Sequence, residues 1–273
     1  MRLLLAGCGK MGGALLEGWL QQGIQPENVF VVEPNGETGA HLTSTYGVSV
    51  FAAPDSLPDH LVPTVVMMAV KPQMMDVVAP AYARFASPAT VFLSIAAGKT
   101  IAYFESILGN DAAIIRAMPN TPAAVGRGIT VCCSNAHVNA AQEDICDQLL
   151  RAVGSVDWVT DEGMIDAVTA LSGGGPAYVF LLSESLAHAG IVAGLPETLA
   201  WRLARETVAG SGELLFQSTE DAATLRKNVT SPGGTTAEAL RVLMGEDDGT
   251  DGWQPLIDAA IKAATKRSRE LAG

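Results

Sequence analysis

Through about residue 160 the chain alternates short apolar runs with segments of helical length. The runs cover residues 2–6, 28–33, 64–70, 90–96, 112–118 and 128–133. They are apolar on both faces, and such runs separated by helices are typical of a buried parallel sheet with crossover helices. The pattern predicts an α/β fold with a doubly wound, Rossmann-type sheet in the N-terminal part.

Beyond residue 161 the strand runs stop and a different rhythm begins. Residues 177–193 are apolar nearly all round, with Pro176 near the expected helix start and Gly194 near its end. Further helices are expected from Pro196 and from Pro255. An all-helical domain of about 110 residues does not readily enclose a fully apolar helix, so helices of a second chain are expected to cover it.

These patterns divide the chain into two expected domains. Residues 1–160 would form the Rossmann-type domain, and residues 161–273 an all-helical domain. The acidic segment 245–252 is interpreted as a solvated loop.

The charge balance narrows the classes of partner. Lys and Arg number 17 against 29 Asp and Glu, so the net charge is −12. Nucleic acids and anionic membrane surfaces both require a basic face, and a small-molecule ligand is favoured instead. The start of the chain has too short an apolar run for a signal peptide, and the longest apolar segment is broken by Glu184 and His188.

Cysteine and histidine usage points to a cytoplasmic protein without a metal site. The four cysteines form no C-x-x-C pair and are interpreted as reduced thiols. Cys132 and Cys133 are adjacent and would point to opposite faces of a strand. The four histidines fall at no metal-ligand spacing.

A dinucleotide signature follows the first apolar run. Gly7, Gly9 and Gly12 have G-x-G-x-x-G spacing between a strand and a helix, where glycines permit a tight turn, close approach of a pyrophosphate and helix packing. Glu33 ends the second run, where an acidic side chain accepts hydrogen bonds from the adenosine ribose and repels a 2′-phosphate. The alternative for Glu33 is a surface glutamate, which would leave the cofactor choice open.

A second glycine turn stands at residues 231–236, "SPGGTT", ahead of a helical segment. Free backbone N–H groups and the positive end of a helix dipole would form an anion site there, and Thr235 and Thr236 could add hydroxyl contacts. If the turn binds an anion, Gly234 is expected to need a positive φ. An ordinary glycine turn with a threonine N-cap is the alternative.

Five ordered motifs together resemble pyrroline-5-carboxylate reductase, an enzyme of proline synthesis. They are "AVKPQ" (69–73), "SIAAG" (94–98), "RAMPNTPAAVGRG" (116–128), "DAVTALSGGGPAYVF" (166–180) and "VTSPGGTTAEAL" (229–240). The resemblance implies that residues 1–160 form the dinucleotide-binding domain and residues 161–273 the dimerisation and substrate domain. It implies an interlocked dimer of helical domains, or a higher oligomer of dimers. It also implies hydride transfer from NADPH or NADH to the C=N carbon of 1-pyrroline-5-carboxylate.

Site residues follow from the same resemblance. Thr236 would be catalytic, with its hydroxyl near the imine nitrogen. The implied cofactor contacts are Gly7, Cys8, Gly9, Lys10, Met11, Gly12, Glu33, Ala69, Val70, Lys71, Ala96 and Ala97. The implied substrate contacts are Ser231, Gly233, Gly234, Thr235 and Thr236. Lys71 could equally be an exposed loop lysine.

The sequence departs from the family pattern at two positions. Gly174 stands where the family usually has serine, so a contact that needs a hydroxyl there is absent. Glu33 stands where many members carry small or basic residues and favour NADPH, so good use of NADH is expected.

Two alternative functions remain at this point. A β-hydroxyacid dehydrogenase would share the N-terminal glycine pattern, and Lys227 beside Asn228 partly matches its catalytic lysine, without the accompanying glycines. A dinucleotide-sensing regulator would bind the cofactor without turnover and would leave the turn at 231–236 without a task.

Overall fold

The computed structural model describes residues 1–245 and 251–272, so most of the predicted acidic loop lies outside the described residues. The chain forms two compact units. Unit 1 comprises residues 1–173 together with the chain end from Ala264, and unit 2 comprises residues 174–263. The boundary expected at residue 160 separates a cofactor-binding domain from a dimerisation and substrate domain, and it stays a prediction.

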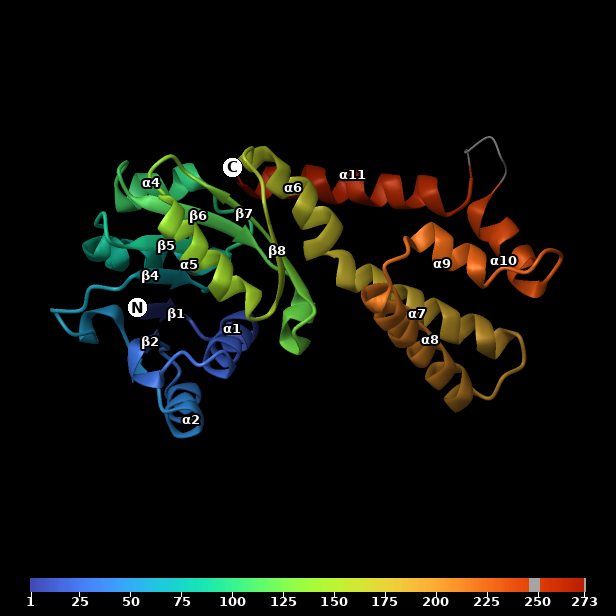
Figure 1. The fold of residues 1–273 in the computed structure, drawn as a ribbon, viewed down its shortest axis with the longest axis horizontal. Coiled ribbons are helices and arrows are strands. Elements are labelled where there is room, and N and C mark those ends of the chain that lie inside the picture. Colours follow the sequence, from blue (N-terminus) through green and yellow to red (C-terminus); the bar gives the residue numbers. More distant parts are fainter. Residues whose placement is uncertain (246–250, 273) are drawn as a thin grey trace. The chain divides into compact units, whose positions relative to one another are not determined.

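Unit 1 is built on one sheet (Figure 1). Within the described residues its strands are β1 (Leu3–Ala6), β2 (Val29–Val32), β3 (Ser49–Phe51), β4 (Val65–Met68), β5 (Val91–Ser94), β6 (Ala113–Met118), β7 (Gly128–Ser134) and β8 (Gly154–Trp158). Their order across the sheet is β3-β2-β1-β4-β5-β6-β7-β8, and neighbours are parallel except β6 and β7. The predicted Rossmann-type sheet is confirmed.

The sheet differs from the sequence prediction at its two edges. The strand β3 is short and partly exposed, and β8 is buried at alternate positions, so neither has the apolar run by which the other strands were found. The strand β7 runs antiparallel to β6. Only a one-turn helix over Thr121–Val125 and a turn at Gly126 join them, which is too short for the crossover that a parallel pair needs.

Helices cover both faces of this sheet. They are α1 (Lys10–Gln21), α2 (Gly36–Tyr46), α3 (Met75–Val78), α4 (Ile101–Leu108), α5 (Ala140–Arg151) and α6 (Ile165–Val168). One apolar cluster packs α1, α2 and α5 against the sheet, and a second packs α3, α4 and α6 against the opposite face. Cys132 lies in the first cluster and Cys133 in the second, as predicted for neighbours on one strand.

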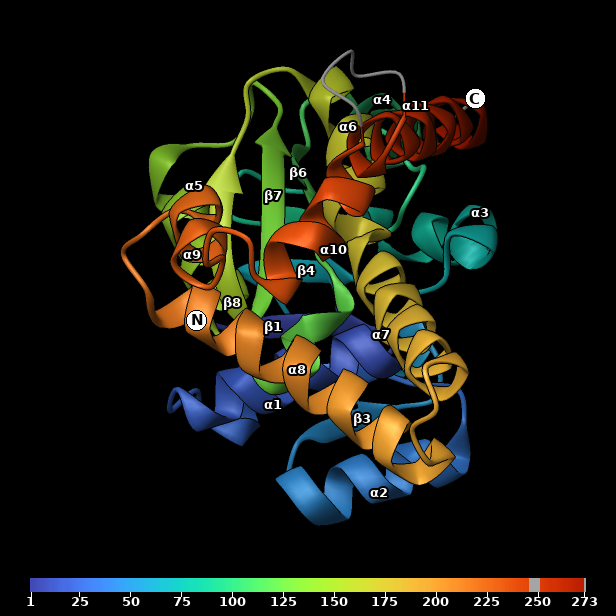
Figure 2. The same cartoon turned by 90° about the vertical axis from the view of Figure 1, so that its right-hand side faces the viewer.

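Unit 2 is helical throughout its described part. It contains α7 (Gly175–Val192), α8 (Glu197–Gln217), α9 (Ala222–Asn228), α10 (Thr235–Met244) and the start of α11 (Trp253–Ala272). The helices α7 and α8 lie side by side in both views (Figure 1, Figure 2). The α11 helix ends in unit 1, to which the residues from Ala264 onward belong.

Within the single chain, the apolar helix α7 is largely uncovered. Pro176 lies in its first turn, and Ala187 is its buried residue, while Phe180 is 62% and Leu181 61% exposed. Contiguous exposed apolar surface of this kind marks an interaction site. By length and composition alone the helical stretch Glu162–Val192 could also cross a membrane, a test that a helix covered by a partner chain passes equally.

Candidate cofactor and substrate sites

The loop between β1 and α1 has the geometry that its glycine spacing predicts. Gly7 has a φ of +84°, and a Cβ there would lie 2.8 Å from Val70 Cγ1. A Cβ on Gly12 would lie 2.6 Å from the carbonyl oxygen of Gly7, so the helix packs closely on the turn. Gly9 is exposed, with nothing within 4 Å of an added Cβ. Its open side is where a pyrophosphate at the start of α1 would fit.

Glu33 reaches back to this loop from the end of β2. Its Oε2 accepts a hydrogen bond of 3.1 Å from the backbone N–H of Cys8, and its Oε1 accepts one of 2.9 Å from the backbone N–H of Asn35. Both carboxylate oxygens are therefore held by backbone amides. The side chain thus places a negative charge at the glycine loop, and the role of Glu33 in cofactor binding stays a prediction.

The Cys8 thiol beside Glu33 is expected to be unreactive. Burial, reinforced by the negative charge of Glu33, raises the pKa of Cys8 to about 11. Since the thiolate is the reactive form, this cysteine is protonated and unreactive near neutral pH. Among the described residues all four cysteines are free and buried.

An apolar cavity of about 330 Å³ lies beside the glycine loop in unit 1. Gly7 and Val70 are at its wall, and the remaining lining residues are Val32, Pro34, Ala52, Ala53, Pro54, Met74, Val77, Val78, Ala81 and Tyr82. Apart from Gly7 and Val70, sequence reasoning did not select these residues. The one available signal was "AAP" (52–54) directly after β3, which is visible only once β3 is known to be a strand. Such a cavity suits the flat, largely apolar face of an adenine ring.

Two further predicted loops follow neighbouring strands at the same edge of the sheet. Ala69, Val70 and Lys71 follow β4, while Ala96 and Ala97 follow β5. Lys71 and Ala97 are exposed, whereas Ala96 is buried. In a doubly wound sheet the carboxyl ends of adjacent strands line the ligand crevice, so these loops can flank a cofactor bound at the glycine loop.

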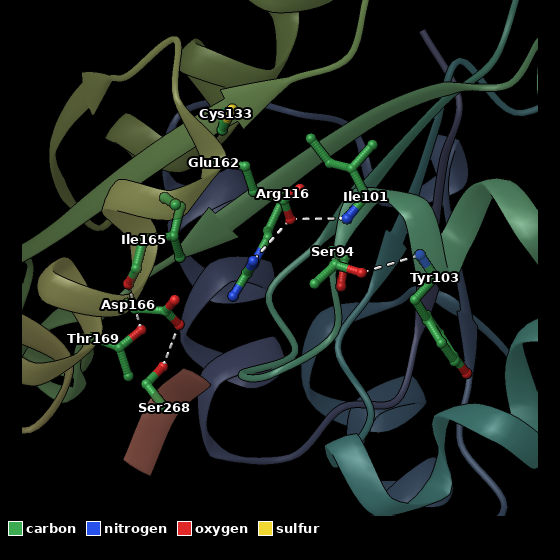
Figure 3. A network of polar contacts seen from close by, with 12 residues as sticks. Ser94, Ile101, Tyr103, Arg116, Cys133, Glu162, Ile165, Asp166, Thr169 and Ser268 are labelled. Atoms are coloured by element: carbon green, nitrogen blue, oxygen red, sulfur yellow. Dashed lines mark hydrogen bonds and ion pairs between the residues drawn. The ribbon is translucent and has the colours of Figure 1, made fainter. Parts of the chain in front are cut away.

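A partly buried ion pair lies next to the start of α4, which follows the β5 loop, and sequence reasoning missed it. Arg116 of β6 is 4% exposed, and its Nη1 lies 2.7 Å from Oε1 of Glu162 (Figure 3). The same Glu162 oxygen accepts a 2.9 Å hydrogen bond from the backbone N–H of Ile101, the first residue of α4. No local pattern signals this pair, because its members are 46 residues apart.

The turn at 231–234 opens α10 in unit 2. The backbone N–H of Gly234 donates to the carbonyl of Ser231 at 3.0 Å, with Pro232 and Gly233 as central residues. Gly233 has a φ of +67°, as the second central position of a type II turn requires. Gly234 is the N-cap of α10 and no side chain caps this end, so the turn is not the threonine-capped alternative. The first backbone N–H groups of α10 therefore lie at an exposed turn, without a side-chain cap.

One expectation about this turn is corrected. Gly234 was expected to need a positive φ, but its φ is −83°, and the positive value belongs to Gly233. Gly234 is restricted by space instead, because a Cβ there would lie 3.1 Å from the carbonyl oxygen of Ser231. Thr235 and Thr236 are both exposed at the start of the helix.

Comparisons with known proteins show the family to which the chain belongs. A family model described as pyrroline-5-carboxylate reductase dimerisation matches residues 162–271, and a model described as NADP oxidoreductase, coenzyme F420-dependent, matches residues 3–98. The pyrroline-5-carboxylate reductase of Pseudomonas aeruginosa is 38% identical over 272 residues, covering 99% of this chain and 97% of the relative. The chain belongs to the pyrroline-5-carboxylate reductase family.

Solved structures agree with this family membership. A pyrroline-5-carboxylate reductase from Coxiella burnetii has a TM-score of 0.91 at 32% identity and covers 100% of this chain and 98% of its own. The Plasmodium falciparum enzyme with NADP bound has a TM-score of 0.81 at 30% identity, with the same coverage. The family's dimerisation domain accounts for the uncovered face of α7, and the chain forms a homodimer.

Proposed function

We propose that this protein reduces 1-pyrroline-5-carboxylate to proline with a hydride from NADH or NADPH, as a soluble cytoplasmic homodimer. The observation that carries the proposal is the uncapped glycine turn before α10, inside the stretch that matches the family's dimerisation model. A chain that only sensed a dinucleotide would have no use for this second anion-binding turn. The four reduced cysteines suit the cytoplasm.

The cofactor half of the site is assigned to unit 1. The glycine loop from Gly7 to Gly12 would hold the pyrophosphate, and the apolar cavity beside it would hold the adenine. The loops after β4 and β5 would flank the nicotinamide through Ala69, Val70, Lys71, Ala96 and Ala97. NAD(P)H, when bound, supplies the hydride that the reaction needs.

The substrate half is assigned to the turn before α10. The exposed amides at this helix start would bind the carboxylate of the substrate, since the N-terminus of a helix favours an anion. Ser231, Gly233, Gly234 and Thr235 would shape that binding site. Thr236, one position into the helix, would place its hydroxyl near the ring nitrogen.

Reduction of the C=N bond requires a hydride at carbon and a proton at nitrogen. The motifs around these sites contain no His, Asp or Glu placed as an obvious general acid. A cyclic imine can bind already protonated, so the nitrogen brings its own proton and the protein contributes chiefly by orientation. In this scheme Thr236 orients the nitrogen and does not itself supply the proton.

Glu33 sets the expected cofactor choice. A carboxylate fixed by two backbone amides at the glycine loop would accept from ribose hydroxyls and would repel a 2′-phosphate. We therefore propose that NADH is used at least as well as NADPH, although one relative's structure contains NADP.

Neither alternative function is favoured. The matched relatives are named pyrroline-5-carboxylate reductase, and the matches cover nearly the whole length of each relative. Asn228, half of the pair that suggested a hydroxyacid dehydrogenase, donates to Glu220 at 3.0 Å on an exposed surface. Assaying a hydroxyacid with NAD beside pyrroline-5-carboxylate with NADH separates the two, since only the second pair is expected to turn over.

A further inference from the structure

The loop after β5 ends in a tight turn over residues 96–99. The backbone N–H of Lys99 donates to the carbonyl of Ala96 at 3.3 Å, and Gly98 has a φ of +75°. A positive φ at the second central position defines a turn that strongly favours glycine. Ala97, the first central residue, is exposed at the tip, while Ala96 is buried beneath it.

The end of the chain packs against this turn. A Cβ added to Gly98 would lie 3.1 Å from the carbonyl oxygen of Leu271 and 3.6 Å from its Cβ. The last turn of α11 therefore lies close beside the backbone of the loop, with the Leu271 backbone facing Gly98 and Leu271 itself 61% exposed. Both segments belong to unit 1, although α11 begins in unit 2.

A buried hydrogen bond anchors this last turn. Ser268 is 6% exposed, and its Oγ donates to Oδ1 of Asp166 at 2.7 Å (Figure 3). A bond from a buried hydroxyl to a carboxylate is among the stronger side-chain interactions. Arg269 also approaches Asp166, at 3.8 Å, but its side chain is 68% exposed and contributes little.

The other sides of the loop are held by different groups. Lys99 Nζ lies 2.7 Å from Asp76 of α3, and the backbone N–H of Ile101 is bound by Glu162. Neither of these contacts constrains Gly98 from the side where Leu271 lies. On that side the atoms nearest to a Cβ on Gly98 all belong to Leu271.

We propose that the last turn of α11 positions the Ala96–Gly98 turn for the nicotinamide cofactor, so that this part of α11 controls cofactor affinity. Leu271 supports the turn directly, and Ser268 acts through its bond to Asp166, so both are positioning residues. The proposal rests on the proposed function, because it needs the turn at Ala97 to touch the cofactor.

The test compares two truncated dimers. One chain ends at Glu270 and so lacks Leu271, and the matched control ends at Ala272 and keeps it. The Kd for NADH, measured by titration of the intact dimer, is expected to rise about threefold to tenfold in the shorter chain, the equivalent of one hydrogen bond. The KM for NADH should rise with it, while the KM for pyrroline-5-carboxylate and the dimer mass stay unchanged.

A double-mutant cycle makes the test specific to the contact with Gly98. Gly98→Ala adds backbone strain in both chains, but its clash with Leu271 exists only in the control. The proposal therefore expects Gly98→Ala to raise the Kd for NADH by a smaller factor in the shorter chain. An equal factor in both chains overturns it, as does an unchanged Kd in the shorter chain.

Two further variants cover the remaining outcomes. If the shorter chain fails to fold, Ser268→Ala is measured in the full chain, where an unchanged Kd for NADH overturns the proposal. Ala97→Asp tests the cofactor assignment, and an unchanged Kd there overturns both the assignment and the proposal. If the wild type reduces pyrroline-5-carboxylate normally and the truncation leaves the Kd for NADH unchanged, only the positioning role is overturned and the proposed function stands.

Discussion

Replacement of Glu33 by glutamine should shift the cofactor preference toward NADPH. The wild-type carboxylate is held at the glycine loop by the amides of Cys8 and Asn35, at 3.1 and 2.9 Å, so it cannot swing away from a ligand there. Glutamine has nearly the same shape and keeps one oxygen to accept from an amide, but it has no charge. The substitution therefore removes the charge together with one of the two hydrogen bonds from the backbone.

The size of the shift follows from Coulomb's law. A unit charge about 4 Å from another is repelled by about 1 to 4 kcal/mol at the effective dielectrics of a protein surface, which is roughly fivefold to several hundredfold in relative kcat/KM. Glu33→Ser should move the ratio in the same direction. Because the carboxylate is partly exposed, the shift should shrink at high ionic strength.

The assay measures kcat/KM with NADPH and with NADH, at saturating pyrroline-5-carboxylate and at low and high salt. Glu27→Gln is the matched control, since Glu27 is exposed just before β2, at the opposite end of the strand from Glu33. It makes the same charge change and should leave the ratio unaltered. A wild type that strongly prefers NADPH, with a ratio that Glu33→Gln does not move, would refute the reasoning.

The remaining predictions concern catalysis, assembly and reactivity. Thr236→Ala and Thr236→Val should each lower kcat/KM by about twofold to a hundredfold, the range for one neutral or charged hydrogen bond, and unchanged kinetics would remove Thr236 from the site. Gly234→Val should lower kcat/KM further, because the added side chain would crowd Ser231. The activity should fall as pH rises through the pKa of the free imine, whereas a pH profile set by another group would indicate that a side chain of the protein acts as the acid. Removal of the chain from Pro255 should abolish folding and association, and a fully active monomer in sedimentation would contradict the shared core. With a pKa of about 11, Cys8 should be about one part in a thousand thiolate at pH 8, so its alkylation should be slow there and rise steadily toward pH 11.

The central strands could be predicted from the sequence because their signal is local. A strand buried on both faces is apolar at nearly every position, and β1, β4 and β5 are wholly buried, with Ser94 as the polar exception. The edge strands β3 and β8 carry no such constraint and were missed. The direction of β7 was also missed, because it depends on the length of one connection and not on the strand's own residues.

The same distinction holds within the sites. The glycines at 7, 9 and 12 were readable because their spacing reflects one local turn, and the structure gives them the backbone geometry that the spacing requires. The pairing of Arg116 with Glu162 and the contact of Leu271 with Gly98 join distant segments, so no window of sequence contains them. At the second turn the motif located the bend correctly but assigned the positive φ to the wrong glycine, because "GG" offers two positions and only the hydrogen bond to Ser231 distinguishes them.

Turnover of the imine is the most direct test of the proposed function. The purified dimer is mixed with 1-pyrroline-5-carboxylate and either NADH or NADPH, and loss of nicotinamide absorbance is followed beside the formation of proline. The proposal predicts catalytic oxidation of the cofactor with one proline formed for each cofactor consumed. Binding of either cofactor without oxidation of NADH or NADPH would contradict it and would favour a dinucleotide-sensing protein.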